Sequence, residues 1–113
     1  MQSSCVFCKI IDRQLPARII KETDELIVID NIAPKTPIHY LVIPKKHIKD
    51  INSLEQEDAL LVGNMVLMMQ ELSKELQGSQ DFRLVVNNGL DAGQSVFHLH
   101  FHFLAGQKFF DHA

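Results

Sequence analysis

The stretch His98-Leu99-His100-Phe101-His102-Phe103-Leu104 alternates histidine with a large apolar residue. In an α-helix, alternate positions are separated by about 200° around the axis, so His100 would oppose His98 and His102. In a β-strand, the three imidazoles share one face and the apolar residues share the other. Aromatic residues also favour strands. We therefore predict a strand over residues 98–104, with its apolar face toward the core and its histidines toward a site.

Three aligned histidines need a specific explanation, because their rings would repel one another once protonated. A single histidine on a half-buried strand is usually only a hydrogen-bonded surface residue. Two functions fit a cluster of three. One is a metal site of the H-x-H type, and the other is a histidine nucleophile beside histidines that bind and protonate an anionic substrate.

The length and charge of the chain limit its class. With 113 residues it is expected to form one domain, residues 1–113. The net charge is −3 with neutral histidines, which argues against a nucleic-acid surface but allows a small anionic ligand. No apolar stretch approaches the roughly 18 residues of a membrane helix, and the N-terminus has no basic segment followed by an apolar run. We expect a cytoplasmic protein with no nucleic-acid or membrane partner.

Cys5 and Cys8 form a C-x-x-C pair. In a reducing cytosol a structural disulfide is not expected, which leaves metal binding or redox chemistry. A thioredoxin-like redox motif would follow a strand, and no strand is predicted before Cys5. Two interpretations fit the spacing: a zinc site completed by two histidines from elsewhere, and a pair of buried thiols without metal.

The remaining patterns predict a short helix, a hairpin, a third strand, a long helix and a fourth strand. Their ranges are 6–12, 17–21 with 25–30, 40–43, 53–77 and 82–87. The long helix is predicted to begin at a capping box of Ser53 and Gln56 and to stop at Gly78. Its apolar stripe is wide enough to cover a sheet and to offer a dimer contact.

Two loops are candidates for holding a ligand. Residues 31–37 contain two prolines and form a rigid connection. Residues 88–95 contain Gly89 and Gly93 and lead directly into the histidine strand. Glycines let backbone N–H groups approach an anion closely, and Gln94 and Ser95 add side-chain donors. The second loop therefore predicts phosphate binding beside a candidate nucleophile.

Three blocks in this order resemble the histidine triad (HIT) family, and within it the Hint-like branch of purine nucleoside phosphoramidases. The blocks are Cys5–Ile11, Pro37–His47 and Gly93–Leu104. The resemblance implies an α+β fold with a five-stranded antiparallel sheet and one long and one short helix, the sheet continuing across a homodimer. It also implies hydrolysis of the P–N bond of a purine nucleoside phosphoramidate to a nucleoside monophosphate and an amine.

The resemblance further implies roles for individual residues. His100 would be the nucleophile, forming a nucleotidyl-histidine that water then cleaves, while His98 and His102 would bind phosphate and orient the ring. His39 would be the fourth histidine, and Ser95 would contact the phosphate and the leaving group. A neutral imidazole is a good nucleophile near pH 7, so no metal is required for the chemistry.

The resemblance also implies a nucleotide pocket. Phosphate and ribose contacts would come from Asn31, Asn87, Gly93, Gln94 and Ser95, together with His100 and His102. The base would lie against Phe7, Ile10, Ile29 and Ile32. Asn31 departs from the family pattern, which usually has an Asp that accepts from both ribose hydroxyls, and an amide lacks the charge-assisted strength of a carboxylate.

Zinc-bearing relatives would bind their metal through the residues that match Cys5, Cys8, His47 and His98. Such a zinc would be structural and would leave His100 and His102 for phosphate. Other functions also fit the motif: splitting of dinucleoside polyphosphates, nucleotidyl transfer within the same superfamily, or a nucleotide-binding scaffold with little turnover.

Overall fold

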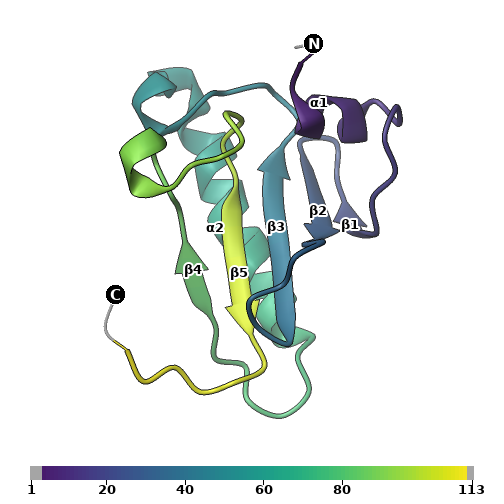
Figure 1. Ribbon diagram of the computed structural model, residues 1–113, viewed down its shortest axis with the longest axis vertical. Helices are drawn as coiled ribbons and strands as arrows, with labels where there is room; N and C mark the ends of the chain where they lie inside the picture. Colours follow the sequence, from purple (N-terminus) through teal and green to yellow (C-terminus); the bar gives the residue numbers. More distant parts are fainter. Residues whose placement is uncertain (1–3, 112–113) are drawn as a thin grey trace.

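The computed structural model describes residues 4–111, which form an antiparallel sheet with one long helix (Figure 1). The strands are β1 (Ile19–Glu22), β2 (Leu26–Asp30), β3 (Ile38–Pro44), β4 (Arg83–Val85) and β5 (Phe101–Ala105), and the helices are α1 (Val6–Ile11) and α2 (Ala59–Lys74). The strand order is β1-β2-β3-β5-β4. The predicted α+β fold, a five-stranded antiparallel sheet with one long and one short helix, is thereby confirmed. Among the described residues, no helix is both long and apolar enough to span a lipid bilayer.

Helix α2 covers one face of the sheet, where it lies behind the strands in Figure 1. Alternate strand residues point to this face because side chains in a strand have a period of two. The strands contribute Leu26, Val28, Val42, Phe101 and Phe103, and α2 contributes Met65, Met69 and Leu72. The apolar face predicted for the histidine strand is therefore core, and the methionine-rich stripe of α2 packs against it.

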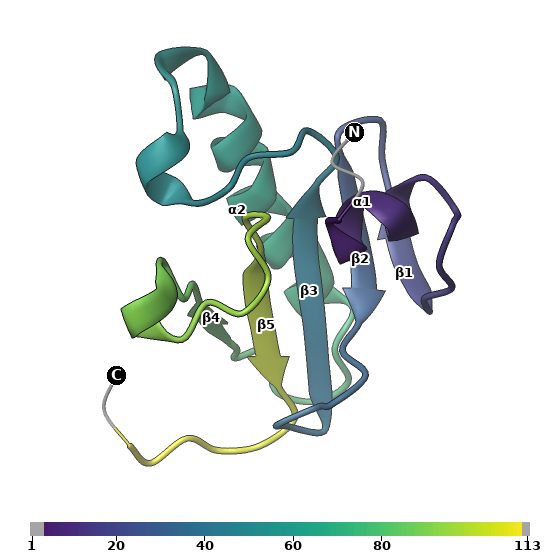
Figure 2. The same ribbon diagram turned by 45° about the horizontal axis from the view of Figure 1, so that its top comes forward.

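Helix α1 lies on the opposite face, in front of β2 (Figure 2). Phe7 and Ile10 of α1 pack there with Ile27, Leu41 and Ile43. The same face of β5 carries His102 and Leu104, which are partly exposed. The short helix thus covers only part of this face, and the histidines occupy the rest.

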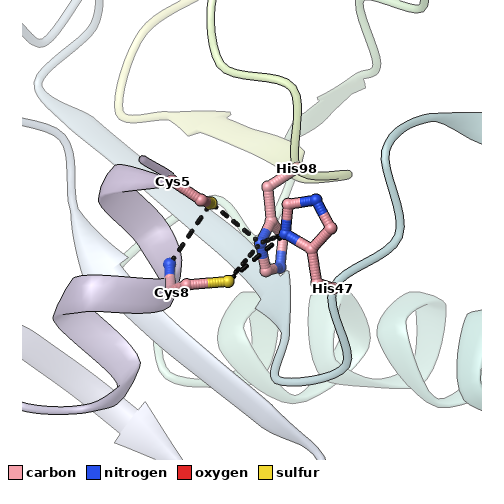
Figure 3. A group of neighbouring side chains, drawn as sticks. All are labelled: Cys5, Cys8, His47 and His98. Carbon is pink, nitrogen blue, oxygen red and sulfur yellow. Dashed lines mark hydrogen bonds between the residues drawn. The ribbon is translucent and has the colours of Figure 1, made fainter. Parts of the chain in front are cut away.

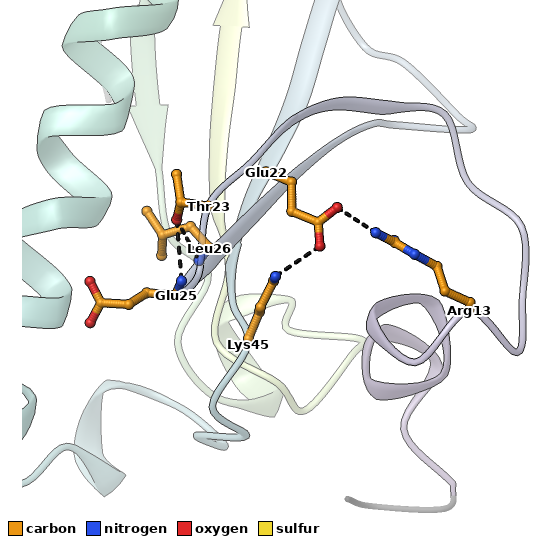
Figure 4. A network of polar contacts seen from close by, with 6 residues as sticks. All are labelled: Arg13, Glu22, Thr23, Glu25, Leu26 and Lys45. Atoms are coloured by element: carbon orange, nitrogen blue, oxygen red, sulfur yellow. Dashed lines mark hydrogen bonds and ion pairs between the residues drawn. The ribbon is translucent and has the colours of Figure 1, made fainter.

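The hairpin of β1 and β2 agrees closely with prediction. The Thr23 hydroxyl accepts hydrogen bonds from the N–H groups of Glu25 and Leu26, which closes the turn (Figure 4). Glu22 pairs with Arg13 and, at 2.8 Å, with Lys45, so one carboxylate links the segment after α1 to the segment after β3. These contacts hold α1 near the end of β3.

The start of the long helix was predicted wrongly. Residues Ile51–Ser53 and Gln56–Asp58 form two 3₁₀ turns, and α2 begins only at Ala59. Asp50 caps the first turn by accepting from the Ser53 N–H at 3.0 Å, so Ser53 does not itself begin a helix. The capping box is formed instead by Glu55 and Asp58.

Strand β5 is also shorter at its start than predicted, because it begins at Phe101 rather than at residue 98. The N–H of Leu99 donates to the Ile48 carbonyl at 2.6 Å, which holds the preceding segment apart from the ladder. Strand β4 likewise covers three residues of the predicted 82–87. The buried side of this region nevertheless keeps its alternation, since Leu99, Phe101 and Phe103 all belong to the core.

Candidate functional site

His39 and His102 meet across strands β3 and β5. In the register of these strands, Leu41 faces His102 and His39 faces Leu104, so the two histidines are diagonal neighbours on the α1 face. His39 Nε2 lies 2.8 Å from His102 Nδ1. The sequence predicted both residues for the site, and the sheet register brings them into hydrogen-bonding contact.

The backbone before β3 sets which nitrogen of His39 carries the proton. The Lys35 N–H lies 3.1 Å from His39 Nδ1, and a backbone N–H can only donate, so Nδ1 accepts. A neutral His39 therefore carries its proton on Nε2 and donates it to His102 Nδ1. His102 in turn keeps its own proton on Nε2, where it forms a hydrogen-bond donor.

Burial keeps both of these rings neutral at pH 7. It is the main cause that lowers the pKa of His39, and it lowers the pKa of His102 to about 4, with further contributions from His100, His39 and Lys35. A chain with one proton on each ring is thus the stable state. Its donor end is His102 Nε2.

His100 is held by the backbone of His98. Its Nδ1 lies 2.7 Å from the His98 carbonyl oxygen, which can only accept, so Nδ1 carries the proton and Nε2 carries the lone pair. Its ring lies 5.0 Å from the Phe7 ring and 5.1 Å from the His102 ring, centroid to centroid. Burial lowers the pKa of His100. The result is a neutral imidazole whose Nε2 is unprotonated, the form that a nucleophile needs.

The cysteine pair and two histidines converge beside this group (Figure 3). Cys5 and Cys8 come from the start of α1, His47 from the segment after β3, and His98 from the segment before β5. Their four ligand atoms all lie within 4.8 Å of one another. This cluster joins three parts of the chain that are distant in sequence, as the metal prediction required.

The proton on His98 is placed so that its ring can bind a cation. Its Nε2 lies 2.7 Å from the Pro44 carbonyl oxygen, so Nε2 donates and Nδ1 carries the lone pair. That Nδ1 lies 3.3 Å from Cys5 Sγ, 3.6 Å from Cys8 Sγ and 3.1 Å from His47 Nδ1. Burial is the largest cause that lowers the pKa of His98, to about 4.

The donor set fits zinc in both chemistry and spacing. Zinc bonds of about 2.3 Å to sulfur and about 2.0–2.1 Å to nitrogen separate tetrahedral ligand atoms by roughly 3.3–3.8 Å. The distances from His98 Nδ1 to the other three ligand atoms, 3.1–3.6 Å, are close to that range. A set of two sulfur and two nitrogen ligands, in which protein atoms fill all four coordination positions of the zinc, is typical of a structural site.

The glycine loop is organised by Gln94. Its Oε1 accepts from the Gly89 N–H at 2.8 Å, and its Nε2 donates to the carbonyls of Lys49 and Val96 at 2.9 and 3.0 Å. The side chain is 3% exposed. Its amide is thus fully used inside the protein, and Gln94 shapes the loop whose adjacent residue is the exposed Ser95.

A cavity of about 730 Å³ lies beside Ser95. Its walls also include Cys5, His47, Lys49 and Phe97, but neither His100 nor His102. The hollow therefore adjoins the cysteine–histidine cluster, on the Ser95 side of the predicted phosphate loop.

The predicted base-binding residues separate into two groups. Phe7, Ile10 and Ile29 are buried together beneath the α1 face, whereas Ile32 is 98% exposed in the loop after β2. Asn31 is half-buried, and its side-chain nitrogen lies 3.1 Å from His39 Nε2. Asn87 is also half-buried, and Gly93 is exposed in the glycine loop.

Three backbone groups that fix the histidines were not predicted from the sequence. They are the Lys35 N–H and the carbonyls of Pro44 and His98. Backbone groups carry no residue-specific signal, so only the two prolines of the 31–37 loop could have indicated that this backbone is held rigidly near His39.

The comparisons with known proteins agree with this geometry. Residues 4–110 match the family model described as "Scavenger mRNA decapping enzyme C-term binding". An uncharacterised HIT-like protein of a Synechocystis strain is 40% identical over 109 residues, which are 96% of each chain.

Solved structures give the same result. A HIT family hydrolase from Clostridium thermocellum is 36% identical, with a TM-score of 0.93 and coverage of 99% of this chain and 98% of the other. A zinc-bound histidine triad family protein from Mycobacterium smegmatis is 32% identical, with a TM-score of 0.79 and coverage of 92% and 76%. The match over nearly the whole chain, with the histidines gathered on one face of the same sheet, shows that this protein belongs to the histidine triad family.

Proposed function

We propose that this protein hydrolyses purine nucleoside phosphoramidates to a nucleoside monophosphate and an amine. The observation that supports this most is the fixed proton on His100: its Nδ1 donates to the His98 carbonyl at 2.7 Å, which leaves Nε2 as a nucleophile. The structural relative described as a HIT family hydrolase supports the reaction class.

In the proposed reaction, His100 Nε2 attacks the phosphorus and the P–N bond breaks. The departing amine takes a proton, and His102 Nε2–H and the Ser95 hydroxyl are the candidate donors. Water then cleaves the P–N bond between phosphorus and His100, which frees the nucleoside monophosphate and restores the ring. His98 supports the reaction through its carbonyl, because that oxygen orients His100.

The nucleotide is expected to lie between α1 and the two loops. Backbone N–H groups near Gly93, with Asn87 and Ser95, would contact phosphate oxygens, and Gln94 would keep that loop in shape. Phe7, Ile10 and Ile29 would form an apolar base under the purine, with Ile32 at its exposed rim. Asn31 would contact the ribose.

We further propose that Cys5, Cys8, His47 and His98 hold a structural zinc ion. A zinc ion bound there would cross-link α1 to the segment after β3 and the segment before β5. His100 and His102 would remain available to bind phosphate. The donor spacing and the zinc-bound relative support this assignment.

The protein is also proposed to be a homodimer whose sheet continues from one subunit to the other. Strand β4 is an edge of the five-stranded sheet, and Leu84 on it is partly exposed, as are Val66 and Leu67 on α2. Size-exclusion chromatography with light scattering tests this assembly, and a monomer at micromolar concentration would contradict it.

Trapping the covalent intermediate tests the reaction directly. The protein is mixed rapidly with an adenosine phosphoramidate, quenched, digested and analysed by mass spectrometry, with diadenosine polyphosphates in parallel. We expect a nucleotidyl group on the peptide that contains His100. Preferential turnover of the polyphosphates would replace the proposed substrate class, and binding without turnover of either would indicate a scaffold.

A further inference from the structure

Asn31, which is predicted to contact the ribose, also contacts a histidine of the site. We propose that Asn31 is a positioning residue that acts on His39, and through His39 on His102. The contact itself is independent of the reaction, whereas its effect on turnover rests on the proposed function.

The orientation of the Asn31 amide is fixed by the backbone. Its Oδ1 accepts from the Ala33 N–H at 3.1 Å, and a backbone N–H can only donate. The amide nitrogen must therefore be the atom that faces His39. It lies 3.1 Å from His39 Nε2 and 3.4 Å from His39 Nδ1.

These two distances place the amide over the face of the ring. A donor in line with one ring nitrogen would be far from the other, yet the Asn31 nitrogen is close to both. The in-plane directions are already used, because the Lys35 N–H lies 3.1 Å from Nδ1 and His102 Nδ1 lies 2.8 Å from Nε2. The NH₂ group of the amide therefore lies over the π surface of an imidazole that is 2% exposed.

An N–H group at this position favours a neutral ring, because its positive end would oppose an imidazolium. The other charged or titratable groups that act on His39 are Lys35 in the loop, Asp30 at the end of β2, and His102 on β5. Asp30 is itself paired with Arg18 at 3.2 Å. A carboxylate at position 31 would reverse the local preference and draw a second proton onto His39.

A second proton would disturb the chain of hydrogen bonds. It would have to sit on His39 Nδ1, which faces the Lys35 N–H and has no acceptor there. The ring would then shift or lose that contact, and the donation to His102 would change with it. By this argument, the amide at position 31 preserves the arrangement in which each ring carries one proton.

The contact can be tested without any substrate. The pKa of His39 is measured by NMR titration in the wild-type protein, in Asn31→Asp, and in Asn64→Asp, a matched charge change on α2 where Asn64 contacts Glu25. We expect Asn31→Asp to raise the pKa of His39 by about one unit or more, as an adjacent carboxylate does, and Asn64→Asp to leave it unchanged. An unchanged pKa in Asn31→Asp would overturn the proposal.

The catalytic consequence is tested with two substrates, an adenosine phosphoramidate and its 2′,3′-dideoxy analogue. We expect Asn31→Asp to move the acid side of the kcat/KM profile to higher pH with both substrates, and His39→Gln to abolish that shift in the double variant. If Asn31→Asp changes only KM and only for the ribose substrate, Asn31 is a ribose ligand alone and the proposal fails. If the wild type hydrolyses neither substrate, the proposed function fails, and the NMR titration still decides the role of Asn31.

Discussion

His98 and His100 are two residues apart, and their rings are prepared for opposite tasks. His98 gives its Nε2 proton to the Pro44 carbonyl, so its Nδ1 faces Cys5, Cys8 and His47 as a ligand. His100 gives its Nδ1 proton to the His98 carbonyl, so its Nε2 is the unprotonated atom. One backbone oxygen per ring decides which nitrogen is available.

The surroundings of the two residues also differ in how their polar atoms are arranged. In the cysteine–histidine cluster, two sulfur and two nitrogen atoms converge on a common centre, an arrangement that suits a cation. In the group of His39 and His102, the Nδ1 atom of each ring accepts from an N–H group, so the rings form a directed chain that ends in the Nε2–H of His102. Histidines close together therefore do not by themselves specify metal or phosphate chemistry. The positions of their protons do.

Removal of the proposed nucleophile should have the largest effect. It tests most directly whether His100, unlike His98, takes part in the reaction. We expect His100→Ala to lower kcat/KM for an adenosine phosphoramidate by about 10³-fold or more, because no other side chain would form the covalent intermediate. Thermal unfolding should still be cooperative, which controls for misfolding. Retention of most of the activity would exclude His100 as the nucleophile.

Loss of a ligand from the cysteine–histidine cluster should mainly lower the stability of the protein. We expect wild-type protein prepared without chelator to contain about one zinc per chain, and Cys8→Ser to lose it with a fall in Tm of about 10 °C, since a lost metal ligand is strongly destabilising in a domain of this size. Elemental analysis and calorimetry measure both quantities. Zinc-free wild type with the same Tm as Cys8→Ser would contradict the metal assignment.

The pH dependence of the free energy of unfolding should reveal the protonation of the hydrogen-bonded histidines His39 and His102. His102 has a pKa of about 4 in the folded protein and an ordinary value of 6.5 when unfolded. Between these values the unfolded chain binds more protons, so the free energy of unfolding is highest above pH 6.5 and falls as the pH drops toward 4.

We expect this fall to be smaller in His102→Gln by about 1–2 kcal/mol, after allowance for the partly exposed ring. Urea titrations of chelator-treated protein at pH 7 and pH 4.5 measure the difference. Equal losses in the two proteins would mean that His102 is not the group that titrates.

The smallest effect, a change in stability, is expected in the glycine loop, residues 88–95, which precedes His98 and His100. Gly93 has a φ of +92°, and an added Cβ would meet no atom within 4 Å, so Gly93→Ala changes only backbone strain. We expect a loss of about 1 kcal/mol. Gly63→Ala is the matched control, because Gly63 lies within α2 with equally open space and should gain about 0.5–1 kcal/mol. Equal changes would argue against strain at Gly93.

Periodicity predicted the sheet well and its ends poorly. The alternation of Leu99, Phe101 and Phe103 identified a buried face even though the strand begins only at Phe101. The failures occur where a local partner overrides the pattern. Asp50 accepts a hydrogen bond from the Ser53 N–H, and α2 begins further along the chain than predicted. The Ile48 carbonyl accepts from the Leu99 N–H, and β5 likewise begins later than predicted.

The site was predicted as a set of residue types but not as a set of orientations. Cys5, Cys8, His47 and His98 come together as the resemblance implied. The same resemblance gave Gln94 a phosphate contact, whereas all of its amide bonds are internal. It also named Ile32 with Phe7, Ile10 and Ile29 as base contacts, but it did not indicate that Ile32 is exposed while the other three are buried. Proton positions depend on backbone atoms that every residue type shares, so no sequence pattern could have supplied them.

The dual use of residue 98 has a consequence for protein engineering. Its ring belongs to the cysteine–histidine cluster, but the oxygen that orients His100 is a main-chain atom that any replacement would retain. The ligand composition of the cluster is therefore open to redesign at this position, for example toward a three-sulfur set, while the acceptor beneath the neighbouring imidazole stays chemically the same.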